Sequence, residues 1–348
     1  MDERITFEEL VYAIGPKTEN FSSQRSLIPS ADPQDIPSEL SEFSFLKRKD
    51  ARRPIAFLQS ENADYFVYKM VDGTKSSPSR EVEVLKELSL HAHRNQQFEN
   101  KVQFPRLEKT FEDGFLYPML IGNPISSLLN ESLDQALMLE IFSQLGEALA
   151  AVHLIARNPG ETDSYDCCFP VPDRGTFTIS EFYEGIGMEF PLLVSAFCRV
   201  KHGIDQLRDK WENQDFIHYD LRAQNILYDT GTKRISLIDW ETAGLGDGLY
   251  DLGTICFELI RASYCSQGKS LPTWTLMHKK MVESYCLHRG SDSFKTFCGS
   301  IQYAAIASLV RSSEKLRITG RLPKVDLLIL KHIDKLIDTP ERFWVMTP

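Results

Sequence analysis

The chain has 348 residues, of which 42% are hydrophobic, and it carries a formal net charge of −10 at pH 7. This length and apolar content are ample for a sizeable core, arranged as one large or two small domains. The acidic charge makes the chain a poor general binder of nucleic-acid backbones, and no apolar run is long enough to span a bilayer.

The seven cysteines form an odd and scattered set. The charged first nine residues lack the apolar centre of a signal peptide. Thiols in a chain without an export signal are typical of a reducing compartment. We therefore expect a cytoplasmic protein that has neither a membrane nor a nucleic acid as its partner.

The first 42 residues are expected to form a short helix and an extended arm. Residues 1–16 place apolar side chains at helical spacing. Residues 17–41 are rich in Ser, Pro, Asp and Asn and lack periodicity, which indicates a loop-like segment. This arm would either cover the sheet that follows it or contact a partner.

From residue 43 onward the pattern predicts β-strands. Alternating apolar residues and polar turns predict strands at 43–48, 55–59 and 65–71. The third of these strands carries Lys69 inside an apolar run. Because burying an unpaired ammonium group is costly, Lys69 either faces solvent or has a partner with a function. The loop at 49–54 contains no glycine.

A helix and a further strand are expected next. Residues 79–90 show helical spacing of apolar side chains and carry Glu81, Glu83 and Glu87. Residues 111–121 are apolar and lead into a Gly-Asn-Pro segment, which suits a strand followed by a linker.

The second half of the chain is mainly helical by pattern. A strong helix is predicted at 132–154, with Ser132 and Gln135 forming a capping box and His153 as a structural hydrogen-bonding residue at its end. Further helices are expected at about 180–213, 252–262, 277–288, 293–311 and 325–337.

The chemistry is concentrated in residues 215–252, where three short apolar runs alternate with polar residues. His218 and Asp220 follow the first run, Asn225 precedes the second, and Asp239 ends the third. The polar turn between the second and third runs predicts a β-hairpin. Such a hairpin would bring Asp220, Asn225 and Asp239 into one small space.

These three side chains suit a magnesium-dependent reaction. Mg²⁺ prefers hard oxygen ligands and is commonly shared with substrate phosphates. Asn225 and Asp239 would hold the metal, and Asp220 would stay free to accept a proton from a hydroxyl group. Turn-forming residues are often Asp or Asn, which accounts for each residue alone but not for three of them between buried runs.

The motifs resemble those of the aminoglycoside phosphotransferase and choline kinase family. The chain reads His-x-Asp-x-x-x-x-Asn from His218, then Ile-Asp-Trp-Glu, then Gly-Asp-x-x-Tyr-Asp-Leu. The first two parts also match protein kinases, with Asp-Trp-Glu in place of Asp-Phe-Gly. The resemblance implies an α+β, protein-kinase-like fold of two lobes. After the arm at 1–42, residues 43–121 would form a small N-lobe of antiparallel sheet with one helix, and residues 122–348 a larger, mainly helical C-lobe.

The resemblance also implies which residues bind the nucleotide. Lys69 would contact the α- and β-phosphates of ATP and would be held by Glu81, or by Glu83 or Glu87 if the register differs. The adenine would lie against the backbone of Pro118, Met119 and Leu120, where Pro118 has no N–H to donate.

For the catalytic loop, the resemblance assigns the remaining roles. Asp220 would act as the base, Arg222 as a cation beside the transferring phosphoryl group, and Asn225 and Asp239 as Mg²⁺ ligands. His218 would orient the loop and Asp251 would brace its backbone. Glu241 would either add a metal ligand or cap the turn. Tyr219 departs from the antibiotic kinases, which commonly carry Gly at that position.

The predicted function is therefore ATP- and Mg²⁺-dependent transfer of a phosphoryl group to a hydroxyl on a small molecule. An alternative acceptor is Ser or Thr of a precursor peptide, as in the stand-alone phosphotransferases of lanthipeptide-type biosynthesis, with the arm at 1–42 docking a leader peptide or a partner enzyme. A third hypothesis is that the protein is a catalytically inactive scaffold that keeps the fold for binding. A pocket for sugars or aminoglycosides should be concave and acidic, whereas a peptide groove should expose apolar or strand-edge surface.

Overall fold

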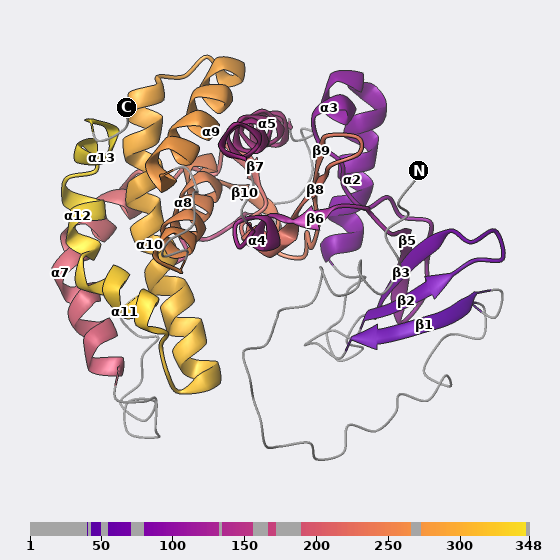
Figure 1. Cartoon of the computed structure of the whole chain (residues 1–348), viewed down its shortest axis with the longest axis horizontal. Coiled ribbons are helices and arrows are strands. Elements are labelled where there is room, and N and C mark those ends of the chain that lie inside the picture. Colours follow the sequence, from indigo (N-terminus) through magenta and orange to yellow (C-terminus); the bar gives the residue numbers. More distant parts are fainter. Residues whose placement is uncertain are drawn as a thin grey trace.

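The computed structural model describes residues 40, 43–49, 55–70, 80–131, 134–155, 166–171, 189–265 and 273–345. The predicted helix at 1–16, most of the arm that follows it, and the loop between the first two strands beyond residue 49 lie outside these residues. Within the described part of the chain, the elements form two lobes (Figure 1).

The smaller lobe contains a five-stranded antiparallel sheet with the strand order β1-β2-β3-β5-β4. One face of this sheet buries Ala56, Leu58, Tyr68 and Leu116 in a small cluster with Leu40, the one described residue of the arm. The strands are β1 (Ser44–Lys49), β2 (Ile55–Gln59), β3 (Tyr65–Met70), β4 (Lys109–Thr110) and β5 (Gly114–Pro118).

The opposite face of the sheet carries Lys69. Successive residues of a strand point to opposite faces, so Lys69 lies on the other side from Tyr68. Its register partner on β5 is Phe115, which packs in the main core with the apolar stripe of helix α2 (Arg80–Arg94). Lys69 therefore faces α2 and not solvent. A second short helix, α3 (Gln96–Lys101), follows α2, whereas we expected one helix here.

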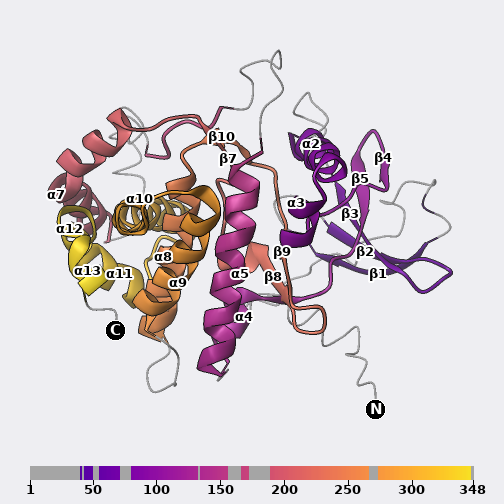
Figure 2. The same ribbon diagram turned by 90° about the horizontal axis from the view of Figure 1, so that it is seen from above.

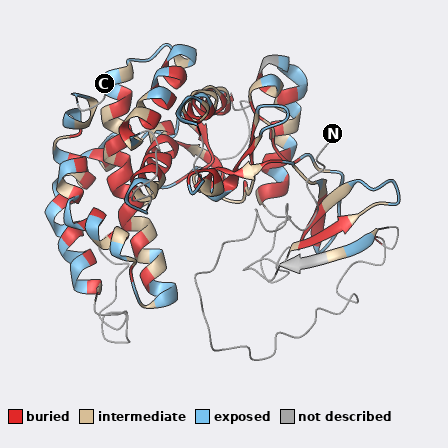
Figure 3. Cartoon of the chain, viewed as in Figure 1, coloured by how far each residue is buried: buried red, intermediate tan, exposed pale blue. Residues whose placement is uncertain are grey.

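The larger lobe is mainly helical (Figures 1 and 2). Its buried residues gather where the helices face one another, and the exposed residues lie on the outer faces (Figure 3). None of the described helices combines the length and the apolar composition needed to cross a membrane. The helices are α4 (Ile125–Leu128), α5 (Gln135–His153), α7 (Phe190–Asp209), α8 (Gly248–Cys265), α9 (Trp274–Arg289), α10 (Ser293–Thr319), α11 (Lys324–Lys331), α12 (Ile333–Asp338) and α13 (Glu341–Val345).

The α8–α10 pair, in particular, is closely packed. Gly253 of α8 faces α10, where a Cβ atom would lie 2.5 Å from the Cβ of Tyr303. Gly146 allows the same approach of α5 to α9, because a Cβ there would lie 2.1 Å from the carbonyl oxygen of Met281. The helices that support the candidate site are thus held at short distances by small residues.

Three helix predictions need correction. Helix α5 begins at Gln135 and is capped by Asp134, whose carboxylate accepts the N–H of Leu137, so the predicted capping box of Ser132 and Gln135 is wrong. Helix α10 continues to Thr319, eight residues past its predicted end. The helix predicted at 325–337 is interrupted at His332, which separates α11 from α12.

The strands around the catalytic motif form two small sheets between the lobes. The predicted hairpin is present, because β8 (Ile226–Asp229) pairs antiparallel with β9 (Arg234–Leu237), and β6 (Asn123–Pro124) adds a third strand. Strand β7 (Asp215–Ile217) pairs with β10 (Gly244–Gly246). The predicted boundary between residues 121 and 122 falls between β5 and β6 and stays a prediction.

Candidate active site

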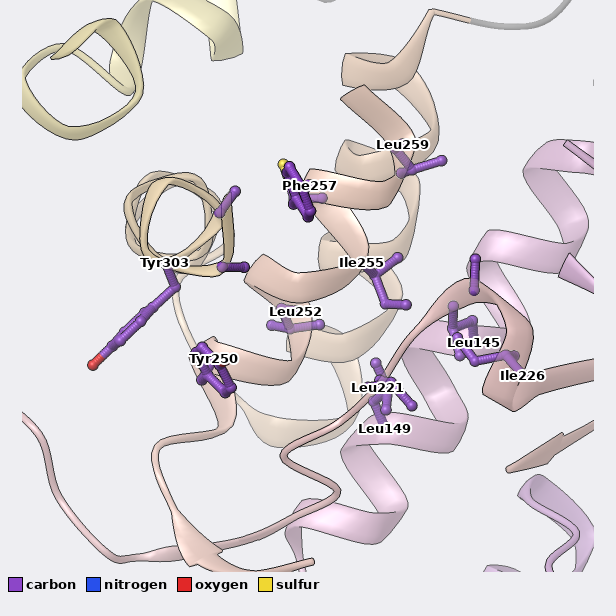
Figure 4. Packing of buried hydrophobic residues seen from close by; sticks show 14 of the residues in the cluster. Leu145, Leu149, Leu221, Ile226, Tyr250, Leu252, Ile255, Phe257, Leu259 and Tyr303 are labelled. Carbon is purple, nitrogen blue, oxygen red and sulfur yellow. The ribbon is translucent and has the colours of Figure 1, made fainter. Parts of the chain in front are cut away.

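The loop that carries Asp220 is anchored in the core by its neighbour Leu221. Leu221 is fully buried and lies beside Leu145 and Leu149 of α5 (Figure 4). Because Leu221 points into the core, its neighbours Asp220 and Arg222 are left on the solvent side, where both are partly exposed. A hydrophobic contact thus fixes the direction of the two polar side chains.

The backbone of the same loop is held by Asp251 in the first turn of α8. The carboxylate of Asp251 accepts the N–H of His218 at 2.7 Å and the N–H of Tyr219 at 2.9 Å. Asp251 is fully buried and its Oδ2 also lies 3.3 Å from Nε2 of His153. His153 bonds Tyr285 through its other ring nitrogen, which confirms that it is a structural hydrogen-bonding residue.

His218 and Tyr219 shape the start of the loop. His218 is buried, lies 2.9 Å from the carbonyl oxygen of Ile238 through Nε2, and its ring centroid is 4.6 Å from that of Trp240. Tyr219 has a left-handed backbone with φ of 66°. Glycine adopts this conformation without strain, which gives a physical reason for the Gly that the antibiotic kinases commonly carry here. Tyr219 is instead held by a hydrogen bond from its hydroxyl to the carbonyl of Cys168.

Asp220 accepts hydrogen bonds from two arginines. The sequence motif indicated Arg222 but not Arg311. Its Oδ1 accepts Nε of Arg222 at 3.0 Å and also a bond from Nη2 of Arg311 on α10. Both arginines also contact Glu314. Burial alone would raise the pKa of Asp220, but the charges of Arg311 and Arg222 outweigh that effect and lower it. Within the described part of the chain, Oδ2 of Asp220 makes no hydrogen bond and is free for a ligand.

Arg311 was missed because the predicted helix ended there. Glu314 and Lys315 follow at the three- and four-residue spacing that places side chains on one face of a helix. Extending the helix to Thr319 would have revealed a charged face beginning with Arg311, but not that this face lies against Asp220.

Asn225 lies behind Asp220 and is linked to the segment that contains Asp239. Its side-chain Nδ2 donates to the carbonyl of Asp220 at 3.0 Å, and its own carbonyl accepts the N–H of Ile238 at 3.0 Å. The hairpin thereby brings the backbone next to Asp239 against Asn225, as predicted. The Oδ1 of Asn225 accepts no hydrogen bond from the described residues, so a hard oxygen ligand is available.

Lys69, Glu81 and Asp239 meet although they come from β3, α2 and the segment after β9. Nζ of Lys69 lies 2.7 Å from Glu81 and 2.5 Å from Asp239. Lys69 is buried. Burial alone would lower the pKa of Lys69, but the charges of Glu81 and Asp239 raise it above its usual value. Of the three candidate glutamates, Glu81 is thus the one that pairs with Lys69, and Glu83 lies exposed.

The residues next to Lys69 fit a divalent cation. Glu81, Asp239 and Glu241 each place a carboxylate oxygen within 4.8 Å of the others. Asp239 and Glu241 are partly exposed, and Asp239 has a positive φ of 69°. Oxygen atoms of carboxylates and amides are the ligands that Mg²⁺ prefers, so the carboxylates of Asp239 and Glu241 suit this metal, and the backbone of Asn225 is bonded to Ile238, the residue before Asp239. A metal ligand role for Glu241 is therefore compatible with its position.

The linker at 118–120 offers fewer donors to an adenine than expected. The N–H of Met119 is donated to the carbonyl of Tyr65 at 2.9 Å, and Pro118 has none. Leu120 is left with an N–H that makes no backbone bond to the described residues. Pro118 and Leu120 also line a pocket of about 150 Å³ with Val102 and Phe104, which is smaller than a typical cofactor site of about 300–1,000 Å³.

A larger pocket of about 350 Å³ adjoins the loop on the side of the helical lobe. Its walls come from the loop after Asp220, from α8, from α10 and from α11. The charged residues that line it are Arg222, Glu258, Arg261, Arg311, Glu314, Lys315 and Asp326. It is therefore concave and mixed in charge, and it shares Arg222 and Arg311 with Asp220.

Comparison with known families identifies the class of the protein. The sequence model of the Phosphotransferase enzyme family matches residues 95–270, about half of the chain, and the chain belongs to this family. The matched segment contains Asp220, Asn225, Asp239 and Asp251. The protein is thus a phosphotransferase. Among curated proteins no sequence matches the chain.

Solved structures share the fold at low sequence identity. The amicoumacin kinase hAmiN, in complex with AMP-PNP, Ca²⁺ and Ami, is similar with a TM-score of 0.60 and 11% identity over 88% of this chain and 92% of that one. Choline kinase from Cryptosporidium parvum is similar with a TM-score of 0.53 and 13% identity, over 90% of this chain and 93% of that one. A microcompartment-associated aminopropanol kinase is similar with a TM-score of 0.52 and 17% identity, over 87% of this chain and 93% of that one. These likenesses confirm the protein-kinase-like, two-lobe α+β fold.

Proposed function

We propose that this protein transfers the γ-phosphoryl group of ATP to the hydroxyl of a small molecule, with ATP bound as its Mg²⁺ complex. The observation that carries the proposal is the arrangement around the loop at 218–225. Lys69 meets Glu81 and Asp239, and Asn225 links the backbone of Asp220 to the segment before Asp239. Oδ2 of Asp220 makes no hydrogen bond to the described residues, and the arginines that hold Oδ1 line a pocket.

On the nucleotide side, Lys69 would bind the phosphates. Glu81 is buried behind it and holds its ammonium group in place. Asp239 also contacts Lys69, so the lysine is positioned from two directions. Mg²⁺ held by Asp239 and Asn225 would neutralise charge on the phosphates. The similar amicoumacin kinase is in complex with the ATP analogue AMP-PNP, which supports ATP as the donor.

On the acceptor side, Asp220 would position the hydroxyl through Oδ2 and accept its proton. The hydroxyl oxygen forms a bond to the γ-phosphorus, and the bond from the γ-phosphorus to the β,γ-bridging oxygen breaks. The electron pair of that bond leaves with ADP, so the products are a phosphomonoester, ADP and a proton. Most of the rate acceleration in such reactions comes from positioning and electrostatic stabilisation, a role that Arg222 and Arg311 would fill next to Asp220.

A small molecule is favoured over a peptide as the acceptor. A peptide groove should expose apolar or strand-edge surface beside Asp220. The neighbouring pocket is instead concave, has a volume of about 350 Å³, and is lined mostly by charged side chains. That volume lies in the range of small-molecule sites, about 300–1,000 Å³.

The test is phosphate transfer from γ-labelled ATP with Mg²⁺ to two panels, one of small alcohols and one of Ser- and Thr-containing peptides. Asp220→Asn and Asp239→Asn should each lower turnover by about 10²- to 10⁴-fold. Asp338→Asn, an exposed position at the end of α12, is the matched control and should keep wild-type turnover. Unchanged turnover in both active-site variants, or label only on peptides, would refute the proposal.

A further inference from the structure

Resting on the proposed function, we propose that the pocket beside Asp220 selects an acceptor alcohol that carries an anionic group, a carboxylate or a phosphate. Lys315 of α10 and Arg261 of α8 would bind that group. The hydroxyl to be phosphorylated would lie at the other end of the pocket, where Arg222 and Arg311 meet Asp220.

Four cationic side chains and three carboxylates line the pocket. The side chains of Lys315, Arg222 and Arg261 are 39%, 35% and 28% exposed. Among the carboxylates, only Glu314 is similarly exposed, at 47%, whereas Glu258 is 17% and Asp326 is 4% exposed. The buried Asp326 lies beneath Arg261 and Lys315 and pairs with both. The lining therefore carries one more positive than negative formal charge, and its least exposed carboxylate is already paired.

Lys315 has hydrogen-bonding capacity left for a ligand. Its Nζ lies 3.7 Å from Oδ2 of Asp326, which is an ion-pair distance but too long for a hydrogen bond. Its Nζ makes no hydrogen bond or other ion pair with the described residues. An ammonium has three donors, so Lys315 can bind a carboxylate or phosphate while Asp326 stays neutralised. Arg261 uses Nε for Asp326 and Nη1 for Glu258 at 3.5 Å, which leaves Nη2 for the same anion.

The helix α10 sets the distance between the two ends of the ligand. Arg311, Glu314, Lys315 and Ile318 follow the three- and four-residue spacing of one helix face, and all four line the pocket. Lys315 lies four residues past Arg311, about 6 Å along the axis at 1.5 Å per residue. The anionic group would thus sit about one helical turn away from the hydroxyl that faces Asp220.

This arrangement disfavours cationic acceptors. A polycationic aminoglycoside is bound best by carboxylates at the mouth of its pocket, and here the exposed carboxylate Glu314 is already contacted by Arg222 and Arg311. Placing an ammonium group beside Lys315 and Arg261 would add like-charge repulsion in a partly desolvated site. The pocket therefore differs from the acidic one expected for an aminoglycoside.

The experiment compares acceptors that differ only in the group remote from the hydroxyl. The probes are 4-hydroxybutanoate and 6-hydroxyhexanoate, their carboxamides, the corresponding amino alcohols, and the corresponding hydroxyalkyl phosphates. Phosphate transfer from labelled Mg²⁺-ATP gives kcat/KM for each. Binding of each probe to the complex with Mg²⁺ and AMP-PNP is measured by calorimetry. The carboxylate and phosphate arms distinguish the two sources of negative charge.

We expect the acids or the phosphates to have a kcat/KM or an affinity about tenfold or more above that of their neutral and cationic counterparts. A difference of this size corresponds to one charge-assisted hydrogen bond. Lys315→Gln should remove most of this preference and act mainly on KM. Lys331→Gln, which removes one exposed positive charge from α11 outside the pocket, should keep the preference. Lys315 is preferred to Arg261 as the test position because Arg261 holds the buried Asp326.

Two results would overturn the proposal. One is transfer to carboxamides or amino alcohols that equals or exceeds transfer to the anionic probes. The other is equal affinity of charged and neutral probes in the calorimeter, with or without turnover. Failure of the proposed function gives a different result, namely that the protein does not bind Mg²⁺ and AMP-PNP and turns over no acceptor at all.

Discussion

Arg311 of α10 donates a hydrogen bond to Oδ1 of Asp220, across 91 positions of the sequence. Arg222 donates to the same oxygen from within the loop. The two guanidinium groups thus fix the carboxylate from both sides and leave Oδ2 open. They also keep the carboxylate ionised, because together they lower the pKa of Asp220 in spite of its burial.

Replacement of Arg311 is predicted to shift the acid limb of the pH–rate profile. In the proposed reaction Asp220 is ionised when it accepts a proton, and its pKa is lowered in the wild type, so activity should persist to low pH. In Arg311→Met the pKa of Asp220 rises, and kcat/KM should fall at a higher pH than in the wild type. Arg311→Lys should restore part of the shift. An acid limb that coincides in all three proteins would contradict this role.

The buried pair of Lys69 and Glu81 allows a double-mutant test. Removing one partner of a buried ion pair leaves an uncompensated charge and costs about 3–5 kcal/mol. Lys69→Met leaves Glu81 buried without its partner and should lower the free energy of unfolding in urea by this amount. Glu81→Met should lower it less, because Asp239 still pairs with Lys69. The double variant should recover much of the loss caused by Lys69→Met and still lack activity. A double variant whose loss equals the sum of the two single losses would show that the residues are not coupled.

Position 219 should prefer glycine to alanine. In most contexts alanine is the more stabilising of the two, because glycine loses more backbone entropy on folding. Here φ is 66°, a conformation that costs a residue with a Cβ about 1–2 kcal/mol. Tyr219→Gly should therefore unfold at a higher urea concentration than Tyr219→Ala. The reverse order would show that the loop relaxes out of the left-handed conformation.

The contact between α8 and α10 should be intolerant of one additional methyl group. In Gly253→Ala the new Cβ would meet the Cβ of Tyr303 at 2.5 Å and the carbonyl of Ser300 at 2.8 Å, and overpacking of this kind costs about 1–3 kcal/mol. Gly299→Ala on α10 is the control, since its Cβ would meet only the flexible end of Leu249 at 2.9 Å. Chemical denaturation should show a clear loss for the first variant and little change for the second.

The sequence revealed those parts of the site that depend on local pattern. Asp220, Asn225 and Asp239 occur within one short stretch, and the hairpin that joins them has a polar turn and alternating strands. Lys69 was recognisable because a lysine inside an apolar strand is unusual, and strand periodicity places it opposite Tyr68.

Contacts between distant elements could not be read in the same way. Arg311 has no local feature that distinguishes it from a solvent-exposed helical arginine. The break at His332 was also hidden, because apolar residues continue at helical spacing on both sides of it. The backbone of Met119 was expected to lie against the adenine. Its N–H instead donates to the carbonyl of Tyr65 and continues the pairing of β5 with β3. In each case tertiary packing decides the outcome.

Helix α8 contacts both the loop that carries Asp220 and the helix that carries Arg311. Its first turn holds the loop of Asp220 through Asp251, and its Gly253 face receives α10, which carries Arg311. The separation of Asp220 and Arg311 therefore depends on the position of α8, which contacts the loop on one side and α10 on the other. Substitutions far from the pocket that tilt α10 on α8 would therefore change the pKa of Asp220.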